Sequence, residues 1–424
     1  MKKLLILNCY NVILNKIRNG FFITITIFIL IFFLFHPHIY CYEETIQSLK
    51  GIKSKQKTIL VTSSTPNIRQ TGLRIYKPEK CYNGYTLFAS PSLKSMEEMV
   101  IHCKHSTALW SHVYLIDMKG KVVYQWEVEP EALHAQLKPN GNLLYNVFMS
   151  PAGLLPGIRE VDPHGNILRI CPGNIVHDFH FLKGGNVLIE ENTYACGSSE
   201  SVLSDRPQIK KITPRGKILW SWSAIEHLNE LEKLTGIQVQ TIGYWAIINT
   251  CEILKSSPLA KIDTRFRKGN IIFSSYILSV VGIIDYLTGE IVWAWGPGEI
   301  EGQHTPTMLD NGNLLIFDNG IRRGWSRVIE LNPLTKEIIW EYHAEPKGEF
   351  FTPIGGGAIP LPNGNILIYE GIKNRIFEIT HEGEIVWDFI STFNQTTVGD
   401  PAIFRAYRYS PEYIRPLLKL INKQ

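Results

Sequence analysis

The chain has 424 residues, of which 45% are hydrophobic and 19% are charged, and its formal net charge is +4. This composition is that of an ordinary folded protein, and the small net charge with scattered basic residues argues against nucleic acid as a partner. By length the chain could form two or three ordinary domains, or a single array of repeated four-stranded units.

The N-terminal segment combines basic residues with an apolar run. Four basic residues lie among the first eighteen positions, and the fifteen residues from Phe21 to Phe35 are all apolar or Thr. This pattern predicts that residues 1–42 are a signal peptide or an N-terminal membrane anchor. We therefore expect the rest of the chain to be exported, to the periplasm or the cell envelope, and to stay associated with the membrane if the segment is an uncleaved anchor. Residues 43–75 are predicted to be a tether or a cap.

Seven cysteines occur, and two of them lie in or beside the targeting segment. An exported body allows disulfides, but its five cysteines leave at least one thiol over. Cys81 with Cys103, or Cys171 with Cys196, are candidate pairs, and the sequence does not choose between them.

A pair of successive hairpins, here called the couplet, recurs along the rest of the chain. In one period, residues 133–139 form a strand, Asn140-Gly141 a type I′ hairpin turn with positive φ at both residues, and residues 142–148 the return strand. Residues 158–170 then form a second hairpin. Four short antiparallel strands in about 40 residues are typical of a propeller blade.

Six copies of the couplet predict an all-β, six-bladed β-propeller over residues 76–415. Residues 224–234 are predicted to form an inserted helix, and residues 243–254 the innermost strand of the fourth blade. The first blade has no obvious innermost strand, and residues 402–413 could supply it and close the ring. Tryptophans end most outer strands and are predicted to fill the wedges between blades, at Trp126, Trp222, Trp293, Trp340 and Trp387.

Several histidines are predicted near the central channel, where small ligands bind to propellers. His134, His177 and His304 each precede a hairpin turn of an innermost strand. His177 lies nine residues before Asn186 and His304 nine before Asn313, so two blades place a histidine at matched positions. Histidine suits nucleophilic and titrating roles, although each could equally be a hydrogen-bonded structural residue.

Two arginines and a fourth histidine complete the candidate set. Arg322 and Arg323 follow the string FDNG, and a guanidinium suits an oxyanion such as sulfate or phosphate, although a solvated loop arginine is the alternative. His180 lies three residues after His177, a spacing that chelates poorly on a strand, so we predict no metal site. No Gly-x-Ser-x-Gly, Walker or Rossmann motif is present, and we predict no cofactor.

Several strings together resemble the arylsulfotransferase family over roughly residues 84–413. They are GYTLFAS with YLIDMKGKVVYQW, QHTPTMLDNGNLLIFDNG, SRVIELNP with IIWEY, IPLPNGNILIYEG with RIFEIT, and FRAYRYSPEYI. The resemblance implies an exported six-bladed propeller that transfers a sulfuryl group between phenols without a nucleotide donor. It also implies that one channel histidine carries the group, while another histidine and an arginine hold its oxygens. His304 and Arg322 resemble the family's histidine and arginine in these strings.

The chain departs from the family pattern at two places. Ile247 stands where the family commonly has a histidine, and the last blade has Gly355 to Gly357 and no histidine matching the sulfuryl carrier.

The sequence thus leads to a hypothesis of sulfuryl transfer on a small phenolic or sulfated substrate. His304, Arg322 and His177 are the candidate catalytic residues, and His134, His180 and Arg323 the candidate substrate-binding residues. The alternative is a non-catalytic propeller that binds a small anion or an envelope partner protein.

Overall fold

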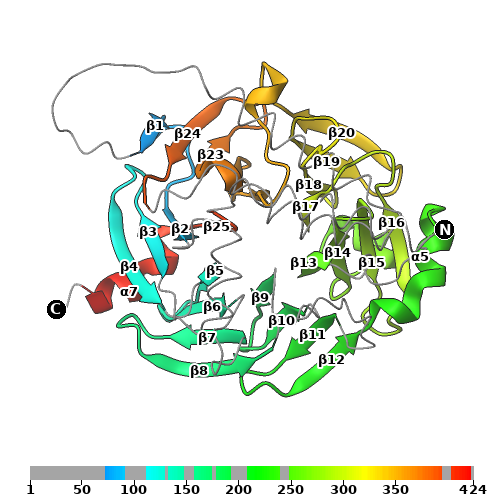
Figure 1. Ribbon diagram of the computed structural model, residues 1–424, viewed down its shortest axis with the longest axis horizontal. Coiled ribbons are helices and arrows are strands. Elements are labelled where there is room, and N and C mark those ends of the chain that lie inside the picture. The colour runs from blue at the N-terminus through cyan, green and yellow to red at the C-terminus, as the bar shows by residue number, and fades with distance from the viewer. Residues whose placement is uncertain are drawn as a thin grey trace, which may run out of the picture.

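The computed structural model describes residues 72–90, 111–128, 132–147, 157–173, 178–191, 208–238, 248–393 and 403–421. The predicted signal or anchor segment and nearly all of the predicted tether or cap lie outside these ranges. Six antiparallel sheets stand around a central axis (Figure 1), so the prediction of an all-β, six-bladed propeller is confirmed.

Each blade runs from an innermost to an outermost strand. Blade 1 consists of β25 (Ala406–Tyr409), β2 (Tyr85–Ser90), β3 (Ser111–Ile116) and β4 (Val122–Val128). Blade 2 consists of β5 (Ala132–Leu137), β6 (Leu143–Val147), β7 (Gly157–Val161) and β8 (Ile167–Pro172). Blade 3 consists of β9 (Phe179–Phe181), β10 (Val187–Glu190), β11 (Ile209–Ile212) and β12 (Ile218–Trp222).

The second half of the ring repeats this order. Blade 4 consists of β13 (Ile248–Ile253), β14 (Ile271–Ser275), β15 (Val280–Ile284) and β16 (Ile291–Trp295). Blade 5 consists of β17 (His304–Met308), β18 (Leu314–Asp318), β19 (Arg327–Asn332) and β20 (Glu337–Tyr342). Blade 6 consists of β21 (Gly357–Pro360), β22 (Ile366–Glu370), β23 (Arg375–Ile379), β24 (Ile385–Ile390) and a fifth, outer strand, β1 (Leu73–Tyr76).

The two ends of the propeller close the ring in two places. β25 pairs with β2, so the C-terminal part of the chain supplies the innermost strand of blade 1, as the sequence predicted. β1 pairs with the outer edge of β24, which places N-terminal residues on blade 6. An unpaired outer edge exposes backbone hydrogen-bonding groups, and β1 covers that edge in blade 6.

The structure corrects the predicted type of the turn at Asn140-Gly141-Asn142. Gly141 alone has a positive φ, 89°, and its N–H donates to the carbonyl of Lys138, so the central residues of the tight turn are Pro139 and Asn140. The predicted type I′ turn is therefore wrong, because proline fixes φ near −65°. A hairpin with a left-handed glycine after the turn takes its place.

The second asparagine of the motif binds a glutamate on the third strand of its own blade. Asn142 donates to Glu160 at 2.8 Å, Asn313 to Glu330 at 2.6 Å, and Asn365 to Glu378 at 2.7 Å. A partly buried carboxylate needs such donors, so the motif recurs because it satisfies the same buried glutamate in three blades.

The outer tryptophans join neighbouring blades, as the sequence predicted. Four of the five donate the indole N–H to a backbone carbonyl in the outer turn of the next blade, whereas Nε1 of the buried Trp126 has no hydrogen-bond partner within the described residues. The pairs are Trp222 with Gly289, Trp293 with Pro333, Trp340 with His381, and Trp387 with Met118. The ring fills the apolar wedge while its one polar atom is satisfied, and in Trp387 this contact links blade 6 to blade 1.

Helices lie at the periphery. The predicted insertion forms η2 (Ala224–His227) and α5 (Leu228–Thr235), and α5 packs beside β16. The C-terminal helix α7 (Pro411–Ile421) buries Ile414 and Leu417 in the core of blades 1 and 2. Four short helices lie in connections: η3 (Pro258–Lys261), η4 (Thr264–Phe266), η5 (Lys347–Glu349) and η6 (Gly371–Lys373). Within the described ranges, no helix has both the length and the apolar character needed to cross a membrane.

Candidate active site at one end of the channel

Polar side chains gather where the innermost strands begin. Because every blade repeats the same meander, these strands all begin at the same end of the central channel (Figure 1). The residues at or next to those beginnings are His134, Asp178, Thr250, His304, Gly357 and Arg405. One end of the channel therefore carries histidines, a carboxylate and a guanidinium.

Asp178 is the centre of one group of contacts. Its side chain is 1% exposed, and its Oδ2 lies 3.1 Å from Nε2 of His180. Its Oδ1 lies 3.4 Å from Nδ1 of His134 and 3.7 Å from Nε of Arg405. The backbone N–H of Cys251 also donates to Oδ2. A buried carboxylate is stable only with such partners. Residues from three blades and from the segment that leads into β25 therefore surround the carboxylate of Asp178.

The pKa values of this group follow from burial and charge. Burial alone would raise the pKa of Asp178, but His180 and Arg405 lower it below its usual range. Burial lowers the pKa of His134 well below its usual value, against the opposing charge of Asp178, so this imidazole is neutral. For His180 burial acts in the same downward direction, but the carboxylate of Asp178 outweighs it and raises the pKa.

Two tyrosines extend the group. The hydroxyl of Tyr407 lies 2.8 Å from Nε2 of His134 and accepts a hydrogen bond from Gln136 at 2.9 Å. Tyr369 is fully buried, and burial raises its pKa to about 12. A side chain at Gly357 would collide with the Tyr369 hydroxyl, because a Cβ there would lie 2.2 Å from it. Gly357, at the start of β21, therefore makes room for the phenol ring of Tyr369.

His304 is held by a fully buried asparagine. Nδ1 of His304 lies 2.8 Å from Oδ1 of Asn319, and Nδ2 of Asn319 donates to the carbonyls of Thr352 and Gly355. Because both amide donors face carbonyls, Oδ1 of Asn319 is fixed as an acceptor. In the neutral ring, Nδ1 of His304 therefore carries the hydrogen, and Nε2 carries the lone pair.

A bulge in β17 connects His304 to the Asp178 group. The pairing with β18 shifts register between His304 and Thr307, and Thr305 has a φ of 48°. The N–H of Thr305 donates to Oγ1 of Thr250 at 3.2 Å, and that same oxygen lies 3.4 Å from a guanidinium nitrogen of Arg405. Bulges commonly re-aim side chains next to sites. Here the bulge places His304 and Thr305 beside the strand that contacts Arg405.

The two predicted arginines lie outside this network. The side chain of Arg322 is 53% exposed, and its backbone N–H and guanidinium both face Glu301. Arg323 donates to Asp318 at 3.0 Å and lies over the ring of Trp325. His177 lies outside the described residues, as does Ile247. The structure thus brings together His134 and His180 and places His304 nearby through Thr250.

Sequence reasoning missed Asp178, Arg405 and Tyr407. Asp178 lies between His177 and His180, which are candidate site residues, but the carboxylate itself is not among the candidates. Arg405 and Tyr407 lie in FRAYRYSPEYI, which supports the resemblance and the ring closure but supplies no candidate site residue. The signal was the arginine Arg405 in the predicted ring-closing segment. An arginine is rarely buried without a partner, so its presence there pointed to a buried acidic or polar partner. Within the described ranges, no three His, Cys, Asp or Glu side chains are grouped to hold a metal ion.

The described cysteines are free thiols at Cys81, Cys171 and Cys251. The other member of each candidate disulfide, Cys103 or Cys196, lies outside the described residues.

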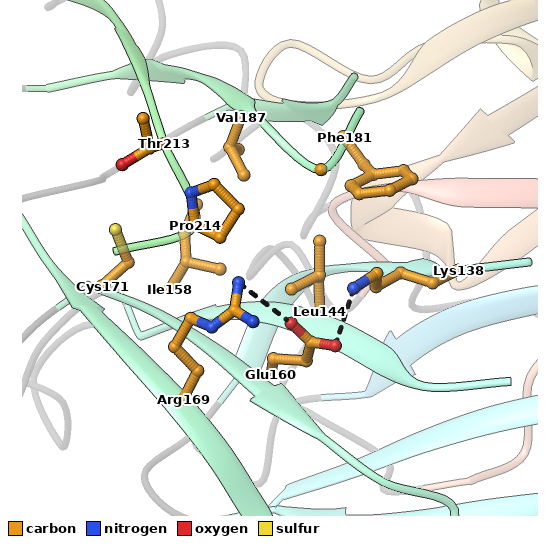
Figure 2. Close-up of a pocket in the computed structure, with 11 residues that line it drawn as sticks. Lys138, Leu144, Ile158, Glu160, Arg169, Cys171, Phe181, Val187, Thr213 and Pro214 are labelled. Carbon is orange, nitrogen blue, oxygen red and sulfur yellow. Dashed lines mark hydrogen bonds and ion pairs between the residues drawn. The ribbon is translucent and has the colours of Figure 1, made fainter. Parts of the chain in front are cut away.

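A small cavity lies between blades 2 and 3 (Figure 2). Its volume is about 20 Å³, and Glu160 on its wall faces Lys138 at 2.7 Å and Arg169 at 3.6 Å. Its other walls are mainly apolar, with Phe181 and Pro214 opposite these charges. Because Glu160 is already paired with two cations and with Asn142, we assign this cavity a role in joining the blades.

The lowered pKa of Asp178 gives a prediction for acid stability. The unfolded state takes up a proton near pH 4, whereas the folded state does so only at lower pH, so the stabilisation by Asp178 is present above about pH 4 and is lost as the pH falls. Urea unfolding of the wild type and of Asp178→Asn should therefore show a difference in unfolding free energy that shrinks below about pH 4. A difference that stays constant through the acid range would contradict this.

Comparison with known proteins gives a family match. The family model described as Arylsulfotransferase (ASST) matches residues 173–392, more than half of the chain. No curated protein matches the chain.

Several solved structures are similar to this chain. A protein of unknown function from Bacteroides caccae is 15% identical, with 77% of this chain and 99% of that chain covered and a TM-score of 0.48. A streptogramin B lyase is 13% identical, with 73% and 89% covered and a TM-score of 0.38. A chain of a nidogen/laminin complex is 9% identical, with 76% and 97% covered and a TM-score of 0.44.

Proposed function

This chain belongs to the arylsulfotransferase family, and on that premise we propose that it transfers a sulfuryl group from a phenolic sulfate to a second phenol, with His304 as the carrier. The observation that carries the proposal is the contact between Asn319 and His304. It favours the tautomer with the hydrogen on Nδ1, the form of the neutral ring in which Nε2 can act as the nucleophile. Gly355 to Gly357 offer no histidine in the last blade, so His304 takes the carrier role in this chain.

The first half of the proposed reaction forms a covalent intermediate. Nε2 of His304 attacks the sulfur of the aryl sulfate, and a nitrogen–sulfur bond forms as the bond from sulfur to the phenolic oxygen breaks. The electron pair of the broken bond stays on the phenolic oxygen, which leaves as the first product. In the second half, the oxygen of another phenol attacks sulfur, and the pair of the nitrogen–sulfur bond returns to Nε2.

The charged groups at the channel support this chemistry. Arg405 is 3% exposed and carries a fixed positive charge where the innermost strands begin, which suits the oxygens of a transferring sulfuryl group. Arg322 is exposed, and we propose that it attracts the anionic donor from solvent rather than contacting the reacting sulfur. The substrates would then be small phenols and their sulfate esters.

The proposal is tested by turnover and by a trapped intermediate. The protein is mixed with p-nitrophenyl sulfate alone, and then with added phenol as acceptor. We expect a burst of p-nitrophenol without acceptor, a mass increase equal to one SO₃ group per chain, and sustained turnover once phenol is added. Absence of turnover across a panel of aryl sulfates would contradict the proposal.

One observation favours a second candidate, a propeller that binds a small anion without catalysis. The last blade has no histidine that matches the family's sulfuryl carrier, and at Gly357 the Tyr369 hydroxyl occupies the space that a side chain would need. In that case sulfate should bind, as measured by calorimetry, while no aryl sulfate turns over.

A further inference from the structure

One histidine at the channel is held like the proton-transfer base of a hydrolase. Resting on the proposed function, we propose that His180, oriented by Asp178, moves the proton of both phenols during sulfuryl transfer. His180 was expected only to bind substrate, and neither the family match nor the sequence assigns it a part in proton transfer.

The geometry of His180 separates its two ring nitrogens. Nε2 lies 3.1 Å from Oδ2 of Asp178, so this nitrogen donates to the carboxylate. Nδ1 has no hydrogen-bond partner within the described part of the chain. The side chain is 23% exposed, whereas that of Asp178 is 1% exposed. A carboxylate that holds one imidazole nitrogen and leaves the other for a ligand is the arrangement that orients catalytic histidines.

The neighbouring His134 cannot take this role. Its side chain is 0% exposed, its Nε2 is held by the hydroxyl of Tyr407, and burial keeps its pKa low. Two histidines whose ring centroids are 6.5 Å apart therefore differ in charge and in access. Environments that push apart the pKa values of neighbouring titratable groups commonly mark acid–base assignments.

The titratable groups around His180 come from its own segment and from three other strands. Glu252 on β13 and Asp178 ahead of β9 favour the protonated imidazole, whereas Arg405 ahead of β25 disfavours it. His134 on β5 is neutral. The two carboxylates outweigh the guanidinium and the burial, so the pKa of His180 is raised. An imidazolium in the resting state can give a proton to a leaving phenolate.

The proton steps balance over one cycle. As the sulfur–oxygen bond of the donor breaks, Nδ1 of protonated His180 gives its proton to the phenolic oxygen, and the first phenol leaves neutral. His180 is then neutral and takes the proton of the acceptor phenol as that oxygen attacks sulfur. The nitrogen–sulfur bond to His304 breaks, and His180 is again protonated.

The test uses donors that differ in their need for a proton. p-Nitrophenolate is a good leaving group without protonation, whereas unsubstituted phenolate is a poor one. In His180→Ala we expect kcat/KM for phenyl sulfate to fall by about 10²–10⁴-fold, the range of general acid catalysis, and that for p-nitrophenyl sulfate to fall far less. Added imidazole should restore part of the loss with phenyl sulfate.

Asp178→Asn provides the matched test of the positioning residue. With the carboxylate gone, the pKa of His180 should fall, so the alkaline limb of the pH profile of kcat/KM should move to lower pH. Far-ultraviolet circular dichroism and the unfolding midpoint check that both variants are folded.

The possible outcomes separate the two proposals. An equal loss for both donors, no loss, or no rescue by imidazole in a folded variant overturns the role of His180 while the enzyme stays active. A wild type that turns over no donor overturns the proposed function, and the role of His180 with it.

Discussion

Replacing His304 with glutamine should lower kcat for sulfuryl transfer by about 10³-fold or more, since loss of the nucleophile in a covalent mechanism removes the main route. Glutamine keeps a polar side chain that can reach Asn319 but has no basic nitrogen to attack sulfur. The burst of p-nitrophenol and the SO₃ adduct should both disappear. Steady-state kinetics and intact-mass measurement check these outcomes together.

Two controls make this result specific to His304. His343→Gln makes the same change on the same blade, at a half-buried imidazole that lies near Trp325 and not at the channel, and should leave kcat unchanged. Asn319→Leu removes the acceptor at Nδ1 and should lower kcat by about 10–100-fold, the usual cost of losing an orienting partner. Normal activity in His304→Gln would show that another group carries the sulfuryl.

Replacing Arg408 with alanine should lower the free energy of unfolding by about 3–5 kcal/mol, the usual cost of breaking a buried ion pair from one side. Arg408 and Glu378 are both 0% exposed and lie 3.2 Å apart. Arg408 also donates to Thr86 at 2.7 Å, and its guanidinium lies over the ring of Trp387. It therefore joins β25 and β2 of blade 1 to β23 and β24 of blade 6, where the ring closes. Urea unfolding measures the change.

Two further variants test the reason for this loss. Lys80→Ala removes an exposed partner of Glu384 on blade 6 and should change stability little, because solvent screens such a pair. The double variant Arg408→Met with Glu378→Leu leaves no uncompensated buried charge, so it should be more stable than Arg408→Ala. If the double variant is as unstable as Arg408→Ala, then lost packing and not the buried charge explains the effect.

Much of the fold could be predicted because it rests on local signals that repeat. The Asn-Gly-Asn turn and the terminal tryptophan each mark a fixed place in a blade, and six copies imply six blades. β25 was predictable for the same reason, since a missing innermost strand must be supplied by the other end of the chain. The turn type was predicted wrongly because Pro139 limits φ at one of the central positions.

The site was predictable only where it follows the repeat. His304 is found by counting back from its turn, because register fixes which residue begins β17. Arg322 was selected because it follows the string FDNG and resembles the family's arginine. In the structure Arg322 pairs with Glu301 at the surface, and no repeated feature of the blades relates these two residues.

The sequence by itself determined the architecture, the histidines that begin the inner strands, and the family. Only the tertiary structure shows that His134 and His180 both lie beside the carboxylate of Asp178. Asp178, His134 and Arg405 come from three separate blades, and no local pattern relates them. The physical reason is that a propeller brings the starts of its inner strands together only when the ring closes. The pKa of each group then depends on partners that are far away along the chain.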